Sequence, residues 1–250
     1  MGSTDPNTMR RLPYIMLAWL LPLAGCLEMD QTITIAKDGS GTQEVVMVLP
    51  SKTMGEVRRA ATVNHNGGRI DPGALFDRAS VEKELKALGL DLKEHQTQVQ
   101  DEVRKVRLTV GFDSCEELAD SPLVGSAAEW DLAPGPVEGS IELSFYPQGR
   151  LAWGQARAQA AKMKGEVDAL VADYFNKRRS QLEGLDLTLR FRLPGKVLRY
   201  TRNMEQTGPN EVTARVNSAQ IRTPEDLVRR LAPRYQVVFS AEDCTIEVSR

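Results

Sequence analysis

The sequence predicts an α+β fold: a curved antiparallel β-sheet of hairpins and meanders, packed by one long helix and several short helices. Two observations lead to this prediction. Apolar residues alternate with polar ones in many short segments that turn-forming residues connect. A segment after residue 150 instead carries apolar residues three or four positions apart. Since strands joined by tight turns pair antiparallel, the chain belongs to the α+β class.

The composition agrees with one ordinary hydrophobic core. The chain has 250 residues, of which 41% are hydrophobic and 26% charged, and its formal net charge is -2. A balance so close to neutral gives no reason to expect a nucleic-acid partner. The 3 cysteines match no zinc-binding spacing. We therefore expect neither a metal nor another cofactor.

The N-terminal segment has the profile of a signal peptide. Met9, Arg10 and Arg11 form a short basic stretch, and the apolar run at 12–24 is too short to span a bilayer comfortably. The residues before Met9 do not suit a signal peptide, and we interpret them as an upstream extension. We expect residues 1–25 to be removed and residues 26–250 to form a single lipid-anchored domain.

The end of this segment resembles the lipobox of bacterial lipoproteins, a Leu and two small residues before a Cys. Leu23, Ala24, Gly25 and Cys26 match it position by position. The resemblance implies that Cys26 is diacylated on its sulfur and becomes the new N-terminus after cleavage. Two or three acyl chains anchor a protein stably. The alternative is that Cys26 is only a hydrophobic residue at the end of a signal-anchor helix.

The residue after Cys26 bears on the location. In enteric-type Gram-negative bacteria an Asp there signals retention at the inner membrane, whereas this chain has Leu27. We expect attachment to the outer membrane, facing the periplasm, if the organism is Gram-negative, and otherwise to the outer face of the cytoplasmic membrane. No second apolar run of membrane-spanning length follows, so a water-soluble domain is predicted at the surface of the bacterial envelope.

The first half of the remaining chain is predicted to contain two hairpins and short helices. Residues 31–49 form a hairpin around residues 37–41, several of which tolerate positive φ. Residues 90–112 alternate with period two around a polar break, which predicts the second hairpin. The other segments are a weak helix at 52–61, a loop at 64–73, a helix at 74–88 ended by Gly89, and a short helix at 112–122.

The second half holds the longest helix signal and the clearest strand. An apolar seam predicts one helix from Trp153 to Leu182 that lies across the sheet, with a coiled-coil partner face as the alternative. The segment from Leu185 to Leu193 alternates strictly and must bury one face. The seam consists of Trp153, Ala156, Ala160, Met163, Val167, Leu170 and Tyr174.

Shorter signals complete the second half of the chain. Thr223 and Pro224 open a helix with a capping-box pattern. The remaining segments are a loop at 133–139, strands around 141–145, 196–202 and 211–216, turns at 194–195 and 206–210, and strands at 235–239 and 244–248 around a turn at 241–243.

The sequence contains no enzyme signature. His65 and His95 are the only histidines, and neither lies in a motif with a nucleophile. Glu116 and Glu117 could be paired carboxylates, but adjacent acids at a helix start ordinarily complement the helix dipole. We expect no catalytic residues.

Two cysteines remain once Cys26 is assigned to the lipid anchor. The bacterial envelope is an oxidising compartment, so Cys115 and Cys244 could form a disulfide that ties the end of the chain to its middle. Two independent buried thiols are the equally open alternative.

Basic residues outnumber acidic ones between Leu185 and Tyr235. A lipid-anchored domain with such a surface could contact anionic headgroups. The alternative is a solvated strand face that keeps its arginines out of the core. The candidate contact residues are Arg190, Arg192, Lys196, Arg199 and Arg202.

The order of the segments resembles the LppM-type lipoprotein domain of bacterial envelopes. The resemblance is carried by the hairpin after Cys26, by "VGFDSCEELADSP", and by "LTLRFRLPGKVLRYTRNMEQTGPNEVTARV". In that pattern a strand ends in Pro-Gly-Lys-Val, here Pro194 to Val197, and an outgoing strand follows a turn, here Val212 to Val216. The resemblance implies a non-enzymatic envelope domain that binds lipid or glycolipid.

These observations predict a lipid-anchored envelope lipoprotein that binds or scaffolds at the membrane surface. Its expected partners are the membrane, through the acyl anchor on Cys26, and anionic lipid or an envelope protein. One alternative is an envelope assembly factor that binds a partner protein through the helix seam or a sheet edge. Another is an envelope hydrolase.

Overall fold

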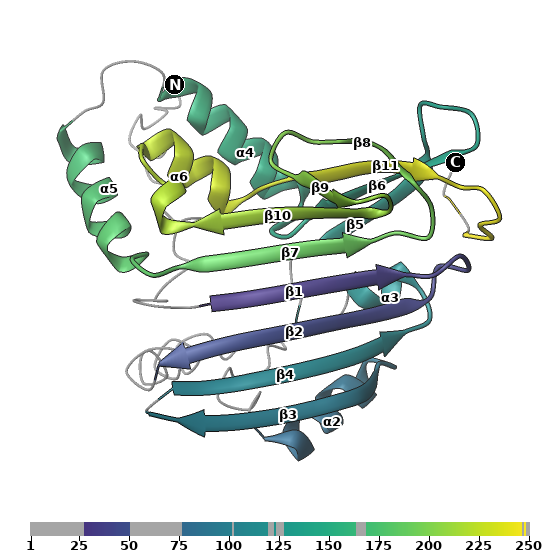
Figure 1. Ribbon diagram of the computed structural model, residues 1–250. Coiled ribbons are helices and arrows are strands. Elements are labelled where there is room, and N and C mark those ends of the chain that lie inside the picture. The colour runs from purple at the N-terminus through teal and green to yellow at the C-terminus, as the bar shows by residue number, and fades with distance from the viewer. Residues whose placement is uncertain are drawn as a thin grey trace, which may run out of the picture.

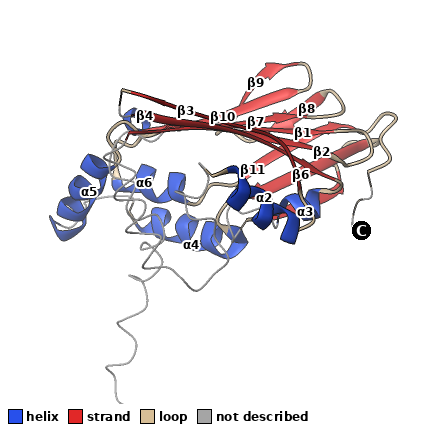
Figure 2. Cartoon of the chain, turned by 90° about the horizontal axis from the view of Figure 1, so that it is seen from below, coloured by secondary structure: helices blue, strands red, loops and turns tan. Residues whose placement is uncertain are grey.

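The alternating segments of the sequence become strands of two separate β-sheets. The computed structural model describes residues 28–50, 77–101, 103–119, 123, 128–163, 169–246 and 248. The strands form a seven-stranded and a four-stranded sheet. Figure 2 shows that the described helices and most of the smaller sheet lie on one side of the larger sheet. The predicted α+β class is confirmed, although with two sheets instead of one.

The seven-stranded sheet has the strand order β3-β4-β2-β1-β7-β10-β9 (Figure 1). The pairs β1–β2 and β3–β4 are antiparallel, so both predicted hairpins are confirmed. The strands are β1 (Glu28–Ile35), β2 (Gly41–Pro50), β3 (Asp91–Gln100), β4 (Val103–Phe112), β7 (Asp186–Arg192), β9 (Glu205–Gly208) and β10 (Glu211–Asn217).

The expectation of purely antiparallel pairing is wrong at one place. Strands β1 and β7 run parallel, with Ile33 opposite Phe191. Tight turns dictate antiparallel pairing only between strands that follow each other directly. Since β1 and β7 are far apart in the sequence, no turn fixes their relative direction.

The four-stranded sheet has the order β5-β6-β11-β8, with antiparallel neighbours throughout. Its strands are β5 (Glu129–Pro134), β6 (Ser140–Tyr146), β8 (Val197–Tyr200) and β11 (Tyr235–Ser240). The loop predicted at 133–139 is partly wrong, because β5 extends to Pro134. A proline is tolerated here because β5 is an edge strand.

The helix predicted to open at Thr223 begins there, whereas the helix predicted at 74–88 begins later, at Arg78. Asp77 caps the N-terminus of α2 (Arg78–Ala87) by accepting a hydrogen bond from the backbone of Ser80. Thr223 and Asp226 form a reciprocal capping box at α6 (Pro224–Leu231). The other helices are α3 (Cys115–Ala119), α4 (Gly149–Lys162), α5 (Ala169–Gln181) and a 3-10 helix at Ser218–Gln220.

The prediction of one long helix from Trp153 to Leu182 is wrong. Helix α4 ends at Lys162, and α5 begins at Ala169. Helix α4 contacts α6 and does not lie across the larger sheet. An apolar period predicts which face of a helix is buried, but it does not predict which element covers that face. No helix in the described ranges is long and apolar enough to cross a membrane.

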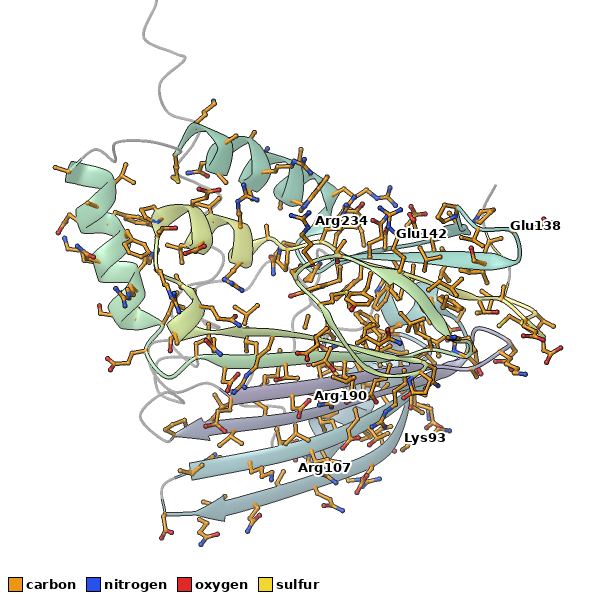
Figure 3. The ribbon with its side chains drawn as sticks, turned by 45° about the horizontal axis from the view of Figure 1, so that its top comes forward. Lys93, Arg107, Glu138, Glu142, Arg190 and Arg234 are labelled. Atoms are coloured by element: carbon orange, nitrogen blue, oxygen red, sulfur yellow. The ribbon has the colours of Figure 1, made fainter. Side chains whose placement is uncertain are left out.

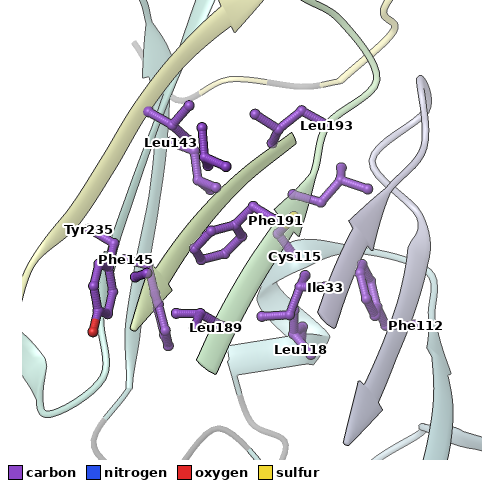
Figure 4. Packing of buried hydrophobic residues seen from close by; sticks show 14 of the residues in the cluster. Ile33, Phe112, Cys115, Leu118, Leu143, Phe145, Leu189, Phe191, Leu193 and Tyr235 are labelled. Carbon is purple, nitrogen blue, oxygen red and sulfur yellow. The ribbon is translucent and has the colours of Figure 1, made fainter. Parts of the chain in front are cut away.

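The main core lies between the two sheets (Figure 4). Phe191 of β7 is fully buried, and its ring meets the edges of Trp130 and Phe145, with ring centroids 5.9 and 6.0 Å away. Trp130 stacks on Phe145 at 4.1 Å. Helices α2 and α3 add Leu85 and Leu118 to the same core. The smaller sheet therefore covers the part of the larger sheet that the long helix was expected to cover.

Two predictions near the C-terminus also change. Residues 205–208 form β9, so the turn predicted at 206–210 is confined to residues 209 and 210. Residues 244–246 form no strand, because the chain there follows the β1–β2 turn, where the Thr245 amide donates to the Lys37 carbonyl at 2.7 Å. The signal peptide, the weak helix at 52–61 and the loop at 64–73 lie outside the described residues.

Candidate functional site

Two of the five predicted contact residues, Arg190 and Arg192, lie on the outer face of the seven-stranded sheet. We define the outer face as the side chains that point away from the smaller sheet and the helices. Arg190 lies 3.3 Å from Asp30 and 3.7 Å from Glu211, and it donates to the Thr32 hydroxyl at 3.0 Å. Arg192 donates to Glu211 at 2.8 Å. Both arginines therefore have acidic partners within the sheet.

The ion pairs of the outer face change the pKa values of their acids. The pKa of Glu211 lies below its ordinary value of 4.5, mainly because Arg192 donates a hydrogen bond to the carboxylate. The pKa of Asp186 lies below 3.8 because Arg215 donates to it, and the pKa of Arg215 rises accordingly. Since these charges compensate one another within the sheet, Arg190 and Arg192 are weak candidates for binding an external anion.

The other three predicted contact residues lie in or next to β8, an edge strand of the smaller sheet whose Val197 amide donates to the Pro209 carbonyl at 2.9 Å. Lys196, Arg199 and Arg202 are exposed, and none of them forms an ion pair with a carboxylate in the described part of the chain. The apolar side chains of Leu198 and Tyr200 are 45% and 40% exposed beside them. We call Lys196, Leu198, Arg199, Tyr200 and Arg202 the β8 edge.

The turn at Pro194 and Gly195 separates the two groups of basic residues. The chain leaves the larger sheet at Arg192 and enters the smaller sheet at Val197. Gly195 packs so closely on the Ser240 carbonyl that a Cβ atom there would overlap it. The resemblance singled out this Pro-Gly pair, and in the structure it joins the two sheets.

A further group of charged and aromatic side chains was not predicted. Trp153 and Arg157 of α4 meet Arg234, which precedes β11. Figure 3 shows Arg234 beside the helices and Arg190 on the larger sheet. The spacing of four between Trp153 and Arg157 is visible in the sequence, but nothing local indicates that Arg234 joins them.

The predicted helix seam is only partly described. Ala160 is fully buried, and Trp153, Ala156 and Met163 are partly buried. Helix α4 packs on α6. The side chains of Val167 and Leu170 lie outside the described residues. Within α4, a partner protein at this seam would therefore have to compete with α6.

Cys115 and Cys244 lie near the same turn but are not joined. The Cys115 sulfur lies 4.0 Å from the Gly39 carbonyl, and the Cys244 sulfur lies 3.8 Å from the Glu242 carbonyl. No disulfide links the two in the described part of the chain. Burial raises the pKa of the Cys244 thiol. The disulfide stays a prediction, and the masses of the oxidised and reduced protein would decide it.

Of the candidate catalytic groups of the sequence, the structure describes the side chains of His95 and Glu117. His95 lies opposite Leu108 and is partly buried, so it faces the core side of β3. Ser114 caps α3 by accepting a hydrogen bond from the Glu117 amide at 3.2 Å, and the Glu117 carboxylate accepts one from the Asp113 amide at 2.8 Å. The described residues contain no group of three His, Cys, Asp or Glu that could hold a metal ion. His65 and the lipobox residues Leu23 to Cys26 lie outside them.

Comparison with known proteins adds a weak similarity to solved structures. No protein-family model and no curated protein matches the chain. Among solved structures, it is similar to the NMR structure of the folded domain of the Mycobacterium tuberculosis LppM protein, with 12% sequence identity and a TM-score of 0.43. The match covers 87% of this chain and 91% of that chain.

Proposed function

We propose that this protein is a non-enzymatic lipoprotein of the bacterial envelope, anchored through Cys26, whose folded domain rests on an anionic membrane surface through the β8 edge. The observation that carries the proposal is the separation of the basic residues. Arg190 and Arg192 have acidic partners, whereas Lys196, Arg199 and Arg202 have none in the described residues and lie beside exposed apolar side chains.

The composition of the β8 edge suits a membrane surface. Each Lys or Arg close to an anionic leaflet contributes about 1 kcal/mol of attraction. The exposed side chains of Leu198 and Tyr200 can enter the interfacial region, where the phenol hydroxyl of a tyrosine stays hydrated. Three cations and two apolar side chains would add to the acyl anchor and would orient the domain on the membrane.

Hydrogen–deuterium exchange in lipid nanodiscs tests this contact. We expect residues 196–202 of the lipidated chain to exchange more slowly in discs that contain phosphatidylglycerol than in discs of phosphatidylcholine alone. The triple variant Lys196→Gln, Arg199→Gln and Arg202→Gln should lose this difference. The matched control is the double variant Arg190→Gln and Arg192→Gln. It removes cations from the outer face and should still show slower exchange of residues 196–202 in the discs with phosphatidylglycerol. Equal exchange of residues 196–202 in both kinds of disc would rule out the contact.

The anchor is tested separately. Cys26→Ala should abolish labelling by radioactive palmitate and prevent cleavage of the signal peptide. Continued acylation of this variant would disprove the assignment of Cys26. A serine at Leu27 serves as the control, because it changes the neighbouring residue and leaves the thiol in place.

Strand β8 is an edge strand, and beyond the hydrogen bond from its Val197 amide to the Pro209 carbonyl it also suits a partner protein that adds a strand to the smaller sheet. This second candidate function would make the protein an assembly factor. The same exchange measurement separates the two, because strand addition would protect residues 197–200 in a partner's presence whatever the lipid composition.

A further inference from the structure

A tryptophan with two neighbouring guanidinium groups lies where α4 approaches the start of β11. The central guanidinium carbon of Arg234 is 4.8 Å from the centre of the Trp153 ring, and that of Arg157 is 5.7 Å from it. Tyr146 of β6 meets the Trp153 ring edge-on at 5.8 Å. Both arginines are within the range of a cation–π contact with one indole.

The charges of this group are not balanced. Arg150, over the Tyr146 ring, forms ion pairs with Glu129 at 3.4 Å and Asp131 at 3.0 Å. Neither Arg157 nor Arg234 forms an ion pair with a carboxylate in the described part of the chain. Two guanidinium groups near one ring repel each other, and a bound anion would relieve that repulsion.

The surroundings hold the group in place. The Asn203 side chain donates to the Arg234 carbonyl at 3.0 Å, which joins the backbone before β11 to the turn after β8. The Tyr146 side chain beneath Trp153 is buried. Trp153 and Arg157 are four residues apart on α4, so one face of the helix presents both. A site built on fixed elements loses little entropy when it binds a ligand.

We propose that Trp153, Arg157 and Arg234 form a binding site for a phosphate group. Arginine is the side chain best suited to phosphate, because its planar fork donates parallel hydrogen bonds to two oxygens. A phosphate monoester with up to two negative charges matches two unpaired guanidinium groups better than a carboxylate with one. The partly buried indole provides an apolar surface for the group that carries the phosphate.

This site is distinct from the contact proposed for the β8 edge, since the two share no residue. The hydrogen bond between Asn203 and Arg234 places the site next to the turn that contains Arg202. The phosphate could therefore come from a lipid headgroup or from a free phosphorylated compound. Either source presents the same group to the two arginines.

NMR of the indole N–H resonances tests the proposal on the full chain in neutral detergent micelles. The chain has 3 tryptophans, and Trp153→Phe assigns the resonance of Trp153. We expect inorganic phosphate and glycerol 3-phosphate to shift this resonance saturably. Arg157→Gln and Arg234→Gln should each weaken binding by about tenfold or more. Arg178→Gln is the matched control, because Arg178 lies 5.3 Å from the centre of the Tyr174 ring, away from this site.

Further samples identify the source of the phosphate. A saturable shift with soluble phosphates supports a free ligand, and a shift only in nanodiscs that contain phosphatidic acid supports a headgroup. The proposal fails if none of these probes shifts the resonance, if acetate at equal ionic strength shifts it equally, or if both glutamine variants bind as the native chain does. None of these results depends on whether residues 196–202 are protected, so the two proposals can fail independently.

Discussion

Phe191 joins the two sheets through contacts with aromatic side chains of the smaller sheet. Its ring is fully buried against Trp130 and Phe145. We predict that Phe191→Ala lowers the free energy of unfolding by about 3–5 kcal/mol, because it removes the ring and leaves a cavity. Urea unfolding, followed by circular dichroism, measures the loss.

The control for this substitution is an aromatic residue outside the core. Tyr174 of α5 is 38% exposed, and Tyr174→Ala, which removes the acceptor of a hydrogen bond from Arg178, should lower the free energy of unfolding by no more than about 1 kcal/mol. Phe191→Leu keeps much of the side-chain volume, so its loss in free energy of unfolding should lie between those of Phe191→Ala and Tyr174→Ala. A loss below about 1 kcal/mol for Phe191→Ala would mean that this ring does not hold the sheets together.

Gln31 is a buried polar residue on the core side of β1. The side chain is 6% exposed, and its amide nitrogen has no hydrogen-bond partner among the described residues. A buried donor without a partner costs about 1–3 kcal/mol. We predict that Gln31→Met, which has a similar shape and no polar hydrogen, raises the free energy of unfolding by about 1 kcal/mol.

Thermal and urea unfolding test the prediction for Gln31. Thr32→Val on the outer face of the same strand is the opposite case, because it removes an acceptor of Arg190 and should destabilise the chain by about 0.5–1.5 kcal/mol. If Gln31→Met were destabilising by the same amount, the amide would have to make a contact that stabilises the fold.

At the scale of elements, the sequence was most informative where the structure depends on neighbouring residues. The β1–β2 and β3–β4 hairpins and the cap of α6 each follow from a turn, a period or a cap within a few residues. Strands β5 and β9 were missed in whole or in part. They are short edge strands of mainly polar or partly buried residues. Their conformation therefore depends on pairing with a neighbouring strand, and the pattern of apolar residues in their own sequence does not predict it.

The long helix shows the same limit. The apolar seam continues across the residues between α4 and α5, so its period gives no sign of an end at Lys162. Gly165, three residues after Lys162, is a helix-ending signal that the sequence analysis did not use. Periodicity placed the buried Ala160 correctly in α4, but in α5 the seam residue Tyr174 is exposed and its neighbour Phe175 is buried instead, so the predicted face is wrong there.

The connection between β7 and β8 depends on Gly195. A Cβ atom at this position would overlap the Ser240 carbonyl, and the Ser240 amide already donates to the Lys196 carbonyl at 2.9 Å. We predict that Gly195→Ala lowers the free energy of unfolding by about 1–3 kcal/mol, because the end of β11 must move. Differential scanning calorimetry would measure the change.

Gly154 provides the control for Gly195. It lies inside α4, and a Cβ atom there would meet nothing within 4 Å. Gly154→Ala should stabilise the chain by about 0.5–1 kcal/mol, because alanine loses less backbone freedom in a helix. If both substitutions changed the free energy of unfolding in the same direction, the close approach of Gly195 to Ser240 would not be the cause of the change at Gly195.

At the scale of the whole molecule, the distribution of charge could not be read from the sequence. Alternation correctly placed Arg190 and Arg192 on the polar side of a strand. Their partners Asp30 and Glu211 come from distant segments, and the parallel β1–β7 pair brings Asp30 close. The order of the strands in the sheet therefore determines which basic side chains have an acidic partner.

The ion pairs of the outer face predict how stability depends on pH. Glu211 and Asp186 have lowered pKa values in the folded state, below the ordinary 4.5 and 3.8. The unfolded chain therefore binds more protons than the folded chain as the pH falls through this range. Their stabilisation is fully present above the unfolded pKa values and is lost as the pH falls through the folded ones. We predict a fall in the free energy of unfolding below about pH 4.5.

Two substitutions assign this pH dependence to the outer face. Arg192→Gln removes the principal partner of Glu211 and leaves Arg190 at 3.7 Å, and Arg215→Gln removes the partner of Asp186. Both should flatten the curve between about pH 5 and 3, Arg215→Gln the less because that pair is exposed to solvent. Arg199→Gln has no ion pair to lose among the described residues and should leave the slope unchanged. High salt should reduce the slope of the native chain, because it screens partly exposed pairs. A slope that survives both substitutions would place the responsible carboxylates elsewhere, and the outer face would then contribute charge but little stability.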